Sequence, residues 1–266
     1  LDAQFLEANH AFGKYVRNNY QDWIHEDDAP DMSHNLLGRQ LIPALKKGQK
    51  VLNIVIDNLR YDQFQVIKSS LEQWGRITDE KLYCGILPTA TQYARNALFA
   101  GLMPSDIKKI HPNCWVEENE EGSKNQHEEE LLQANLKRHG VNVSNKYYKV
   151  STLDFGKRLA DNFEGNKDVE LITLVYNFVD MLSHARTDMA VIKELASDED
   201  AYRSITKSWF DRSPLFEIYK KALSMGYRVF LTTDHGTVRT RNPVQVIGDR
   251  DTSTNLRYKL GRNLNY

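Results

Sequence analysis

Three apolar runs, each leading into an aspartate, constrain the fold of this chain more than any other feature of its sequence. They are VLNIVI (Val51–Ile56), LITLVYNF (Leu171–Phe178) and YRVFLTT (Tyr227–Thr233). Continuous apolar runs of this length are typical of strands that are buried on both faces of a parallel sheet. Stretches with helical spacing lie between the runs. We therefore predict an α/β fold with a mainly parallel central sheet flanked by helices.

Glycines and acidic residues indicate where the intervening helices begin and end. One helix is expected after Ala90. EEELLQANLKRHG has acids in its first turn and ends at Gly140, and PLFEIYKKALSMG ends at Gly226; a glycine just past the last turn is a common helix terminator. The opening residues place Phe5 and Phe12 on one helix face. We expect the first forty-odd residues to be helical and peripheral.

Composition excludes some classes of protein. Lys plus Arg total 35 and Asp plus Glu total 36, so no overall field attracts nucleic acid or an anionic membrane. No apolar run is long enough to span a membrane, and the first residues do not resemble a signal peptide. Cys84 and Cys114 lack metal-type spacing; a disulfide is one reading and reduced thiols the other. We expect a cytoplasmic protein without membrane insertion.

The acids at the strand ends suggest a metal site. Asp57, Asp180 and Asp234 each follow one of the three runs, and ligands of open parallel sheets bind at the carboxyl ends of the strands. Three carboxylates placed together repel unless a cation joins them. His235 follows Asp234 directly, and His184 lies four residues after Asp180, on one face of a helical turn. The alternatives are turn-forming aspartates and an ordinary helix-face histidine.

The stretch ILPTATQYARNALFAGLMP (Ile86–Pro104) contributes a hydroxyl. We predict a short strand ending at Pro88, then two threonines, Thr89 and Thr91, and a helix. Helix capping is the simplest role for either threonine. A hydroxyl at a helix N-terminus also lies where backbone N–H groups favour an anion such as phosphate. If a metal bound that hydroxyl, it would become a nucleophile at neutral pH.

Taken together, these blocks resemble the alkaline phosphatase superfamily, in which they occur in the same order. More narrowly, IVIDNLRYDQF, LPTATQYARNALFAGLMP, YNFVDMLSHART and LTTDHGTVR resemble the PglZ domain of PorX-type response regulators. Those are two-component proteins of Bacteroidetes linked to the type IX secretion system. The similarity runs from about Ser33 to the end. It suggests a helical segment or linker over residues 1–32, the end of a preceding helical module, and an alkaline phosphatase-like PglZ domain over residues 33–266.

The resemblance implies a site for two zinc ions. The ligands of the ion that activates the nucleophile would be Asp57, Thr91, Asp234 and His235. The other ion would be held by Asp180 and His184. Thr91 is preferred over Thr89 as the nucleophile because it matches the second threonine of the superfamily's Pro-Thr-x-Thr turn.

Two further residues match less closely. Asn96 falls where relatives keep a phosphate-binding amide, and Arg95 is a candidate partner for phosphate that could equally point to solvent. The superfamily normally supplies a third ligand to the Asp180/His184 ion from a later histidine, but no histidine follows His235. We therefore expect a further C-terminal segment, the alternative being a weakly held second ion. The receiver domain of PorX-type proteins is not in this sequence either, so we expect truncation at the start as well.

The function implied is a zinc-dependent phosphodiesterase acting on nucleotides or short oligonucleotides, as the output domain of a PorX-type regulator. Implied partners are a second copy bound through a preceding receiver domain, a sensor kinase and secretion-system regulators. A phosphomonoesterase and a non-catalytic, metal-stabilised regulatory module remain alternatives, whereas Thr91 cannot form the formylglycine of sulfatases. A basic run could track phosphates or be ordinary surface. Its members are Arg239, Arg241, Arg250, Arg257, Lys259 and Arg262.

Overall fold

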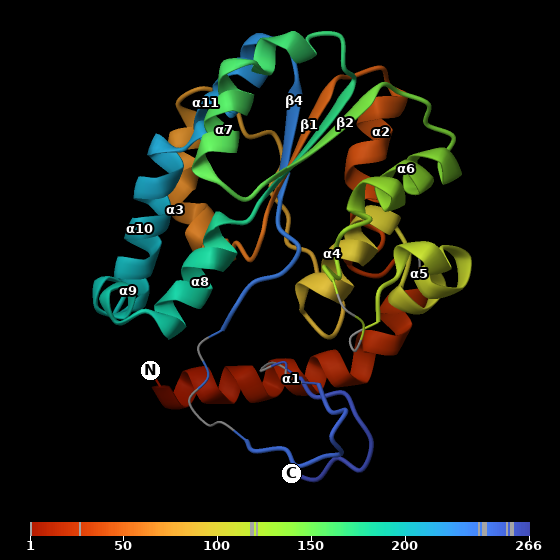
Figure 1. Cartoon of the computed structure of the whole chain (residues 1–266), viewed down its shortest axis with the longest axis vertical. Helices are drawn as coiled ribbons and strands as arrows, with labels where there is room; N and C mark the ends of the chain where they lie inside the picture. The colour runs from red at the N-terminus through yellow and green to blue at the C-terminus, as the bar shows by residue number, and fades with distance from the viewer. Residues whose placement is uncertain are drawn as a thin grey trace.

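The computed structural model describes residues 2–26, 28–117, 120, 122–238, 240, 244–253, 255 and 258–266. Within these residues a four-stranded parallel sheet forms the centre of the molecule, in the order β2-β3-β1-β4 (Figure 1). The strands are β1 (Val51–Ile56), β2 (Asn145–Val150), β3 (Leu171–Tyr176) and β4 (Arg228–Thr232). The predicted α/β class and parallel sheet are confirmed, and the three predicted strands are β1, β3 and β4.

The position of β1 decides how the strand ends are grouped. Val51 pairs with both Leu171 of β3 and Arg228 of β4, so β1 runs in register between them. All three strands are parallel, so their carboxyl ends lie at one edge of the sheet. Whatever follows β1 is therefore flanked by the residues that follow β3 and β4.

Helices cover both faces of the sheet (Figure 1). The larger layer packs on the face that carries Leu52, Ile54 and Ile56 of β1. Its members are α3 (Tyr61–Glu72), α7 (Leu153–Asp161), α8 (Phe178–Asp188), α10 (Glu199–Arg212) and α11 (Pro214–Ser224). Val51 and Val55 face the second layer. It is built from α2 (Ile42–Lys46), α4 (Thr91–Ala100), α5 (Pro104–Ile110) and α6 (Glu128–Arg138). Burial on both faces explains why β1 is apolar throughout.

The N-terminal helix α1 (Asp2–His25) extends the helix predicted from Phe5 and Phe12. Its C-terminal part is anchored, because Trp23 is buried in a small cluster with Met32 and Ile86. Phe5 and Phe12, by contrast, are 64% and 60% exposed. None of the described helices is long and apolar enough to cross a membrane.

Several details differ from the sequence-based expectations. Strand β2, NKYYKV, was not predicted, because its polar residues interrupt the apolar signal at this edge of the sheet. The predicted short strand ending at Pro88 is wrong: Cys84 makes an isolated bridge to Met32 and the following residues are loop. Residues 36–45 are largely buried against the sheet rather than peripheral. Both cysteines are free.

Four shorter helical segments complete this description, among them the 3₁₀ helices η2 (Pro112–Cys114) and η3 (Phe163–Asn166). Helix α9 (Ala190–Leu195) connects α8 to α10, and a π-helical turn, η1 (Leu37–Leu41), leads into α2. Helix α6 ends at Arg138, followed by Gly140 with φ of 68°, and α11 ends at Ser224, followed by Gly226 with φ of 78°. Both predicted glycine terminators therefore lie in the left-handed region that glycine adopts most readily.

Candidate metal centre

Asp57 is placed by the continuation of β1. Its backbone N–H donates to the carbonyl of Tyr176 at 2.8 Å, as the next step of the parallel ladder. The chain then turns sharply at Asn58, whose φ of 63° lies in the left-handed region that asparagine tolerates better than most residues. This turn directs the Asn58 backbone N–H to Asp234 Oδ1 at 3.2 Å. The ends of β1 and β4 are thereby joined.

A second set of hydrogen bonds fixes the end of β4. The hydroxyl of Thr233 accepts from the N–H of Leu59 at 3.0 Å and donates to the carbonyl of His235 at 2.7 Å. The His235 backbone N–H donates to Asp234 Oδ1 at 2.9 Å. Asp234 and His235 are therefore held against the turn after Asp57, which brings together residues that are distant in sequence.

Four side chains converge at this point. The ligand atoms of Asp57, Asp234 and His235 all lie within 4.8 Å of one another, and all three residues are buried. His235 Nε2 lies 3.6 Å from Asp57 Oδ1 and 3.7 Å from Asp234 Oδ2. The same nitrogen lies 2.9 Å from Thr91 Oγ1. Two carboxylates, an imidazole and a hydroxyl form a ligand set suited to a zinc-type cation.

The hydrogen bonding of the two carboxylates tests whether a cation fits here. Asp234 Oδ1 accepts from two backbone N–H groups, and Asp57 Oδ2 forms an ion pair with the guanidinium of Arg95. The other oxygens, Asp57 Oδ1 and Asp234 Oδ2, are buried and have no hydrogen-bond partner. These are the two oxygens nearest His235 Nε2. Buried carboxylate oxygens are costly without a donor or a cation, so the residues present fit a metal ion.

The two carboxyl groups differ in their ionisation. Burial, reinforced by the charge of Asp234, raises the pKa of Asp57 to about 8, although Arg95 acts in the opposite direction. Burial also disfavours the charged form of Asp234. His235, Arg95 and two backbone N–H donors outweigh it there, and they lower the pKa of Asp234 below its ordinary value. When no metal is bound, Asp57 therefore keeps a proton to a higher pH than an ordinary carboxyl group does, whereas Asp234 does not.

Thr91 occupies the first position of α4. The N-cap residue is Ala90, and no side chain caps the helix. The hydroxyl of Thr91 therefore contacts His235 instead of capping, and its carbonyl accepts from Asn125 Nδ2 at 3.1 Å. Thr89 lines a neighbouring cavity. The choice of Thr91 as nucleophile stays a prediction, and this geometry is consistent with it.

The second predicted pair is more open. Asp180 lies in the first turn of α8, four residues beyond the end of β3, and accepts from the side-chain amide of Asn58 at 3.1 Å. His184 Nε2 lies 3.5 Å from Asp180 Oδ2, as the spacing of four predicts, and its side chain is 74% exposed. Within the described ranges no third Asp, Glu, His or Cys joins them as a ligand group.

The two predicted phosphate contacts are both buried. Arg95 does not point to solvent: its side chain lies between Asp57 and Glu128, 3.0 Å and 2.8 Å away. Asn96 donates to the carbonyl of Lys124 and accepts from Asn125. Their roles in phosphate binding stay predictions, and in this conformation both side chains are engaged with protein.

Two residues at this centre were missed from the sequence. Asn58 bridges the two halves of the site through its backbone and its amide. Glu128, one of the acids in the first turn of the helix predicted up to Gly140, is buried: its side chain is 1% exposed and pairs with Arg95. No sequence signal distinguishes Glu128 from its exposed neighbours, since all three acids fit the first turn of a helix.

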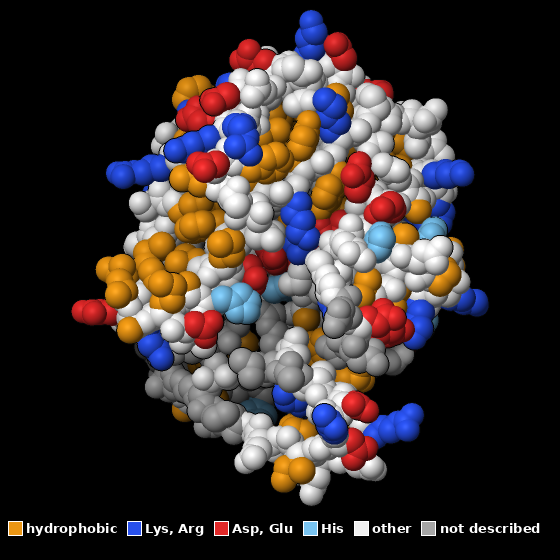
Figure 2. All heavy atoms as spheres, in the orientation of Figure 1, with side chains coloured by type: hydrophobic (Ala, Val, Ile, Leu, Met, Phe, Trp, Pro, Cys, Tyr) orange, Lys and Arg blue, Asp and Glu red, His pale blue; other side chains and the backbone are white. Residues whose placement is uncertain are grey.

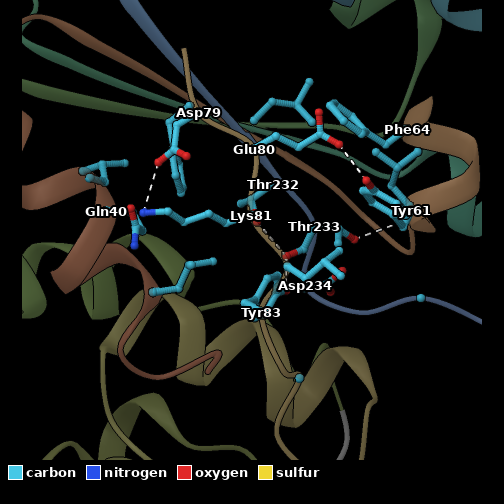
Figure 3. Close-up of a pocket in the computed structure, with 18 of the residues that line it drawn as sticks. Gln40, Tyr61, Phe64, Asp79, Glu80, Lys81, Tyr83, Thr232, Thr233 and Asp234 are labelled. Carbon is cyan, nitrogen blue, oxygen red and sulfur yellow. Dashed lines mark hydrogen bonds and ion pairs between the residues drawn. The ribbon is translucent and has the colours of Figure 1, made fainter. Parts of the chain in front are cut away.

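A cavity of about 760 Å³ lies beside β4 and reaches the centre at Asp234 and His235. Figure 3 shows Lys81 beside Asp79, Glu80 hydrogen-bonded to Tyr61 of α3, and Thr232, Thr233 and Asp234 close by. Acidic and histidine side chains gather near the middle of the face seen in Figure 2. Arg239, Arg241 and Arg257 of the basic run lie outside the described residues, and Lys259 donates to the carbonyl of Ser253.

A parallel sheet flanked by helices, with buried acids and a histidine at its carboxyl edge, defines an alkaline phosphatase-like domain. The model of the BREX system PglZ alkaline phosphatase-like domain matches residues 36–266, well over half of the sequence, so the chain belongs to the PglZ family. No curated protein matches the chain. Family membership indicates a phosphoesterase-type hydrolase, and the buried Asp57, Asp234 and His235 could hold its metal.

Proposed function

We propose that the chain is a zinc-dependent phosphodiesterase that cleaves nucleotide or short oligonucleotide diesters with Thr91 as nucleophile. The observation that carries the proposal is the convergence of Thr91 Oγ1, Asp57 Oδ1, Asp234 Oδ2 and His235 Nε2, in which both carboxylate oxygens lack a partner. The adjoining cavity of about 760 Å³ has the size of a nucleotide-binding pocket.

In the reaction we propose, Thr91 Oγ1 gives its proton to water and attacks phosphorus. As the new P–O bond forms, the bond to the leaving oxygen breaks and the alkoxide takes a proton from water. A water molecule then hydrolyses the phosphothreonine, which returns the hydroxyl to Thr91 and releases a phosphate monoester. Zinc, when bound, would lower the pKa of the attacking hydroxyl and offset charge on the leaving oxygen. Asp57, Asp234 and His235 would hold one ion. Asp180 and His184, tied to them through Asn58, would supply ligands to a second.

The wider biological setting belongs to the same proposal. We propose an output domain of a PorX-type response regulator, preceded by a receiver domain through which two copies pair, with a sensor kinase upstream. The division between a helical segment (residues 1–32) and the PglZ domain (residues 33–266) is part of it, and Trp23, packed against Met32 and Ile86, supports a fixed junction.

Two threonines of one loop provide a matched test. Thr91→Ala should reduce hydrolysis of bis-p-nitrophenyl phosphate by at least about a thousandfold, because the attacking group is removed. Thr89→Ala should retain activity, since Thr89 lines the cavity and not the centre. Zinc content should be unchanged in Thr89→Ala. Full activity in Thr91→Ala would rule out Thr91 as the nucleophile. A preference for p-nitrophenyl phosphate over the diester would favour a monoesterase.

A further inference from the structure

The guanidinium of Arg95 is buried and contacts two of the candidate metal ligands. It lies one helical turn after Thr91 on α4, on the same face. Nη1 is 3.0 Å from Asp57 Oδ2, and Nε is 3.8 Å from Asp234 Oδ2. A cation at this position has two opposite effects. It steadies the carboxylates, but it also competes with a metal ion for them.

Glu128 is the third carboxylate in contact with Arg95, and it is fixed from another direction. Its Oε1 lies 2.8 Å from Arg95 Nε. Its Oε2 accepts a short hydrogen bond from the hydroxyl of Tyr147, and Lys149 Nζ lies 3.4 Å from Oε1. Tyr147 and Lys149 are two residues apart on β2, so their side chains share one face of the strand. Contacts from α4 and β2 therefore hold Glu128 in place.

The two carboxylate oxygens of Asp57 therefore have different neighbours. Arg95 Nε lies 2.8 Å from Glu128 Oε1, and Nη1 lies 3.0 Å from Asp57 Oδ2, so the guanidinium forms an ion pair with Asp57 at Oδ2. Asp57 Oδ1 is left facing His235 Nε2, and Asp234 Oδ2 is left without a hydrogen bond. Arg95 Nε lies 3.8 Å from Asp234 Oδ2. Without the charge of Glu128, Nε would be free to move into hydrogen-bond distance of that oxygen.

We propose that Glu128 is a positioning residue of the metal centre: it holds Arg95 so that the guanidinium braces Asp57 Oδ2 and leaves Asp57 Oδ1 and Asp234 Oδ2 to a cation. The inference rests on the proposed function in that it needs a metal at Asp57, Asp234 and His235. It does not depend on which phosphate ester is cleaved.

The affinity of the folded protein for metal tests this role directly. Zinc affinity is measured by competition with a chromophoric chelator, and Co²⁺ is used as a second probe because its visible spectrum reports ligand geometry. Glu128→Gln, which keeps the shape but removes the charge, should weaken the tighter zinc site about ten- to a hundredfold, the usual range for residues that orient metal ligands. It should also alter the Co²⁺ spectrum. Glu129→Gln, an exposed position on the same helix turn, is the control and should change neither.

A second variant covers the case in which Glu128→Gln does not fold. Tyr147→Phe keeps the charge of Glu128 and removes the hydroxyl that holds Oε2, so zinc affinity should fall about three- to tenfold. Wild-type zinc affinity and Co²⁺ spectra in the folded variants would overturn the positioning role while leaving phosphodiesterase activity intact. If the wild type binds zinc but cleaves no diester, the proposed function fails and the positioning role is still decided by affinity. A wild type that binds no metal overturns both.

Discussion

Zinc binding should release a proton from Asp57. Its pKa of about 8 in the metal-free protein means that a metal which takes Asp57 Oδ1 must displace a proton at neutral pH. The measurement is made on the Thr91→Ala variant, so that the threonine hydroxyl contributes no proton. Between pH 7.5 and 8.5, above the range in which an ordinary imidazole is charged, the released amount should fall from roughly 0.8 to roughly 0.2 proton per zinc. Apparent affinity should rise about threefold over the same interval.

Titration calorimetry in buffers of different ionisation enthalpy measures this release. An Asp57 with an ordinary carboxyl pKa would release almost nothing, and the affinity would be flat with pH. Adding Asp57→Asn to the same background removes the titrating carboxyl, so the pH-dependent release should vanish. A flat profile in the Thr91→Ala protein refutes the reasoning, and a release that survives Asp57→Asn assigns the proton to another group.

The Asp57 carboxyl group also makes the stability of the metal-free protein depend on pH, and its contribution decreases as the pH rises. The folded pKa of Asp57 is raised from 3.8 to about 8, so the folded state binds the proton more tightly than the unfolded chain. This contribution is fully present below pH 3.8 and is lost as pH rises through 8, by at most about 1.4 kcal/mol per pH unit. Bound zinc would stabilise the ionised form of Asp57, so the zinc-loaded protein would not lose this contribution as the pH rises. The difference in Tm between zinc-loaded and chelated protein should therefore widen from pH 6 to pH 8, and a constant difference would contradict the assignment.

Three substitutions probe the rest of the centre. Arg95→Met should destabilise the metal-free protein by about 3–5 kcal/mol in urea unfolding, because the buried acids around it lose the guanidinium that lies between them, and zinc should offset part of the loss; an unchanged midpoint would contradict this. Asn58→Gly keeps the left-handed turn but loses the amide on Asp180, so unfolding should change by less than about 1 kcal/mol while the weaker zinc site loses affinity. His184→Ala removes an exposed side chain, so the midpoint should move by no more than about 0.5 kcal/mol while zinc stoichiometry falls toward one. Two zinc ions retained in His184→Ala would exclude it as a ligand.

The predictable part of the fold is the part with a continuous apolar signal. Strands β1 and β3 are buried along their whole length, and β4 is apolar enough to be found beside them. Strand β2 lies at an edge of the sheet, and its sequence NKYYKV, in which three of the six residues are Asn or Lys, resembles an exposed segment. The short run before Pro88 is apolar because Ile86 is buried in the α1 cluster, not because it pairs in the sheet. The local sequence pattern therefore predicts well which residues are buried, but it predicts poorly which segments pair as strands.

The site was predictable where it follows from strand order and not where it follows from helix packing. Asp57, Asp234 and His235 lie beyond adjacent parallel strands, so their proximity follows from topology. Glu128 reaches the centre only because α6 packs against α4, which no local pattern encodes. The inward direction of Arg95 was within reach, since it lies one turn after Thr91 on the same helix face.

Strand β4 gives the candidate metal a mechanical role as well as a chemical one. It bonds to β1 on one side, and within the described residues no strand pairs with its other side. The strand that delivers Asp234 and His235 is therefore held laterally by a single ladder, while its neighbour β1 has two. A cation shared between Asp57 and Asp234 would fasten the end of β4 to the end of β1, at the place where an edge strand frays most readily. Occupancy of the centre and cohesion of the sheet would then rise and fall together, so the hydrogen-exchange rates of the β4 amides would report metal loading.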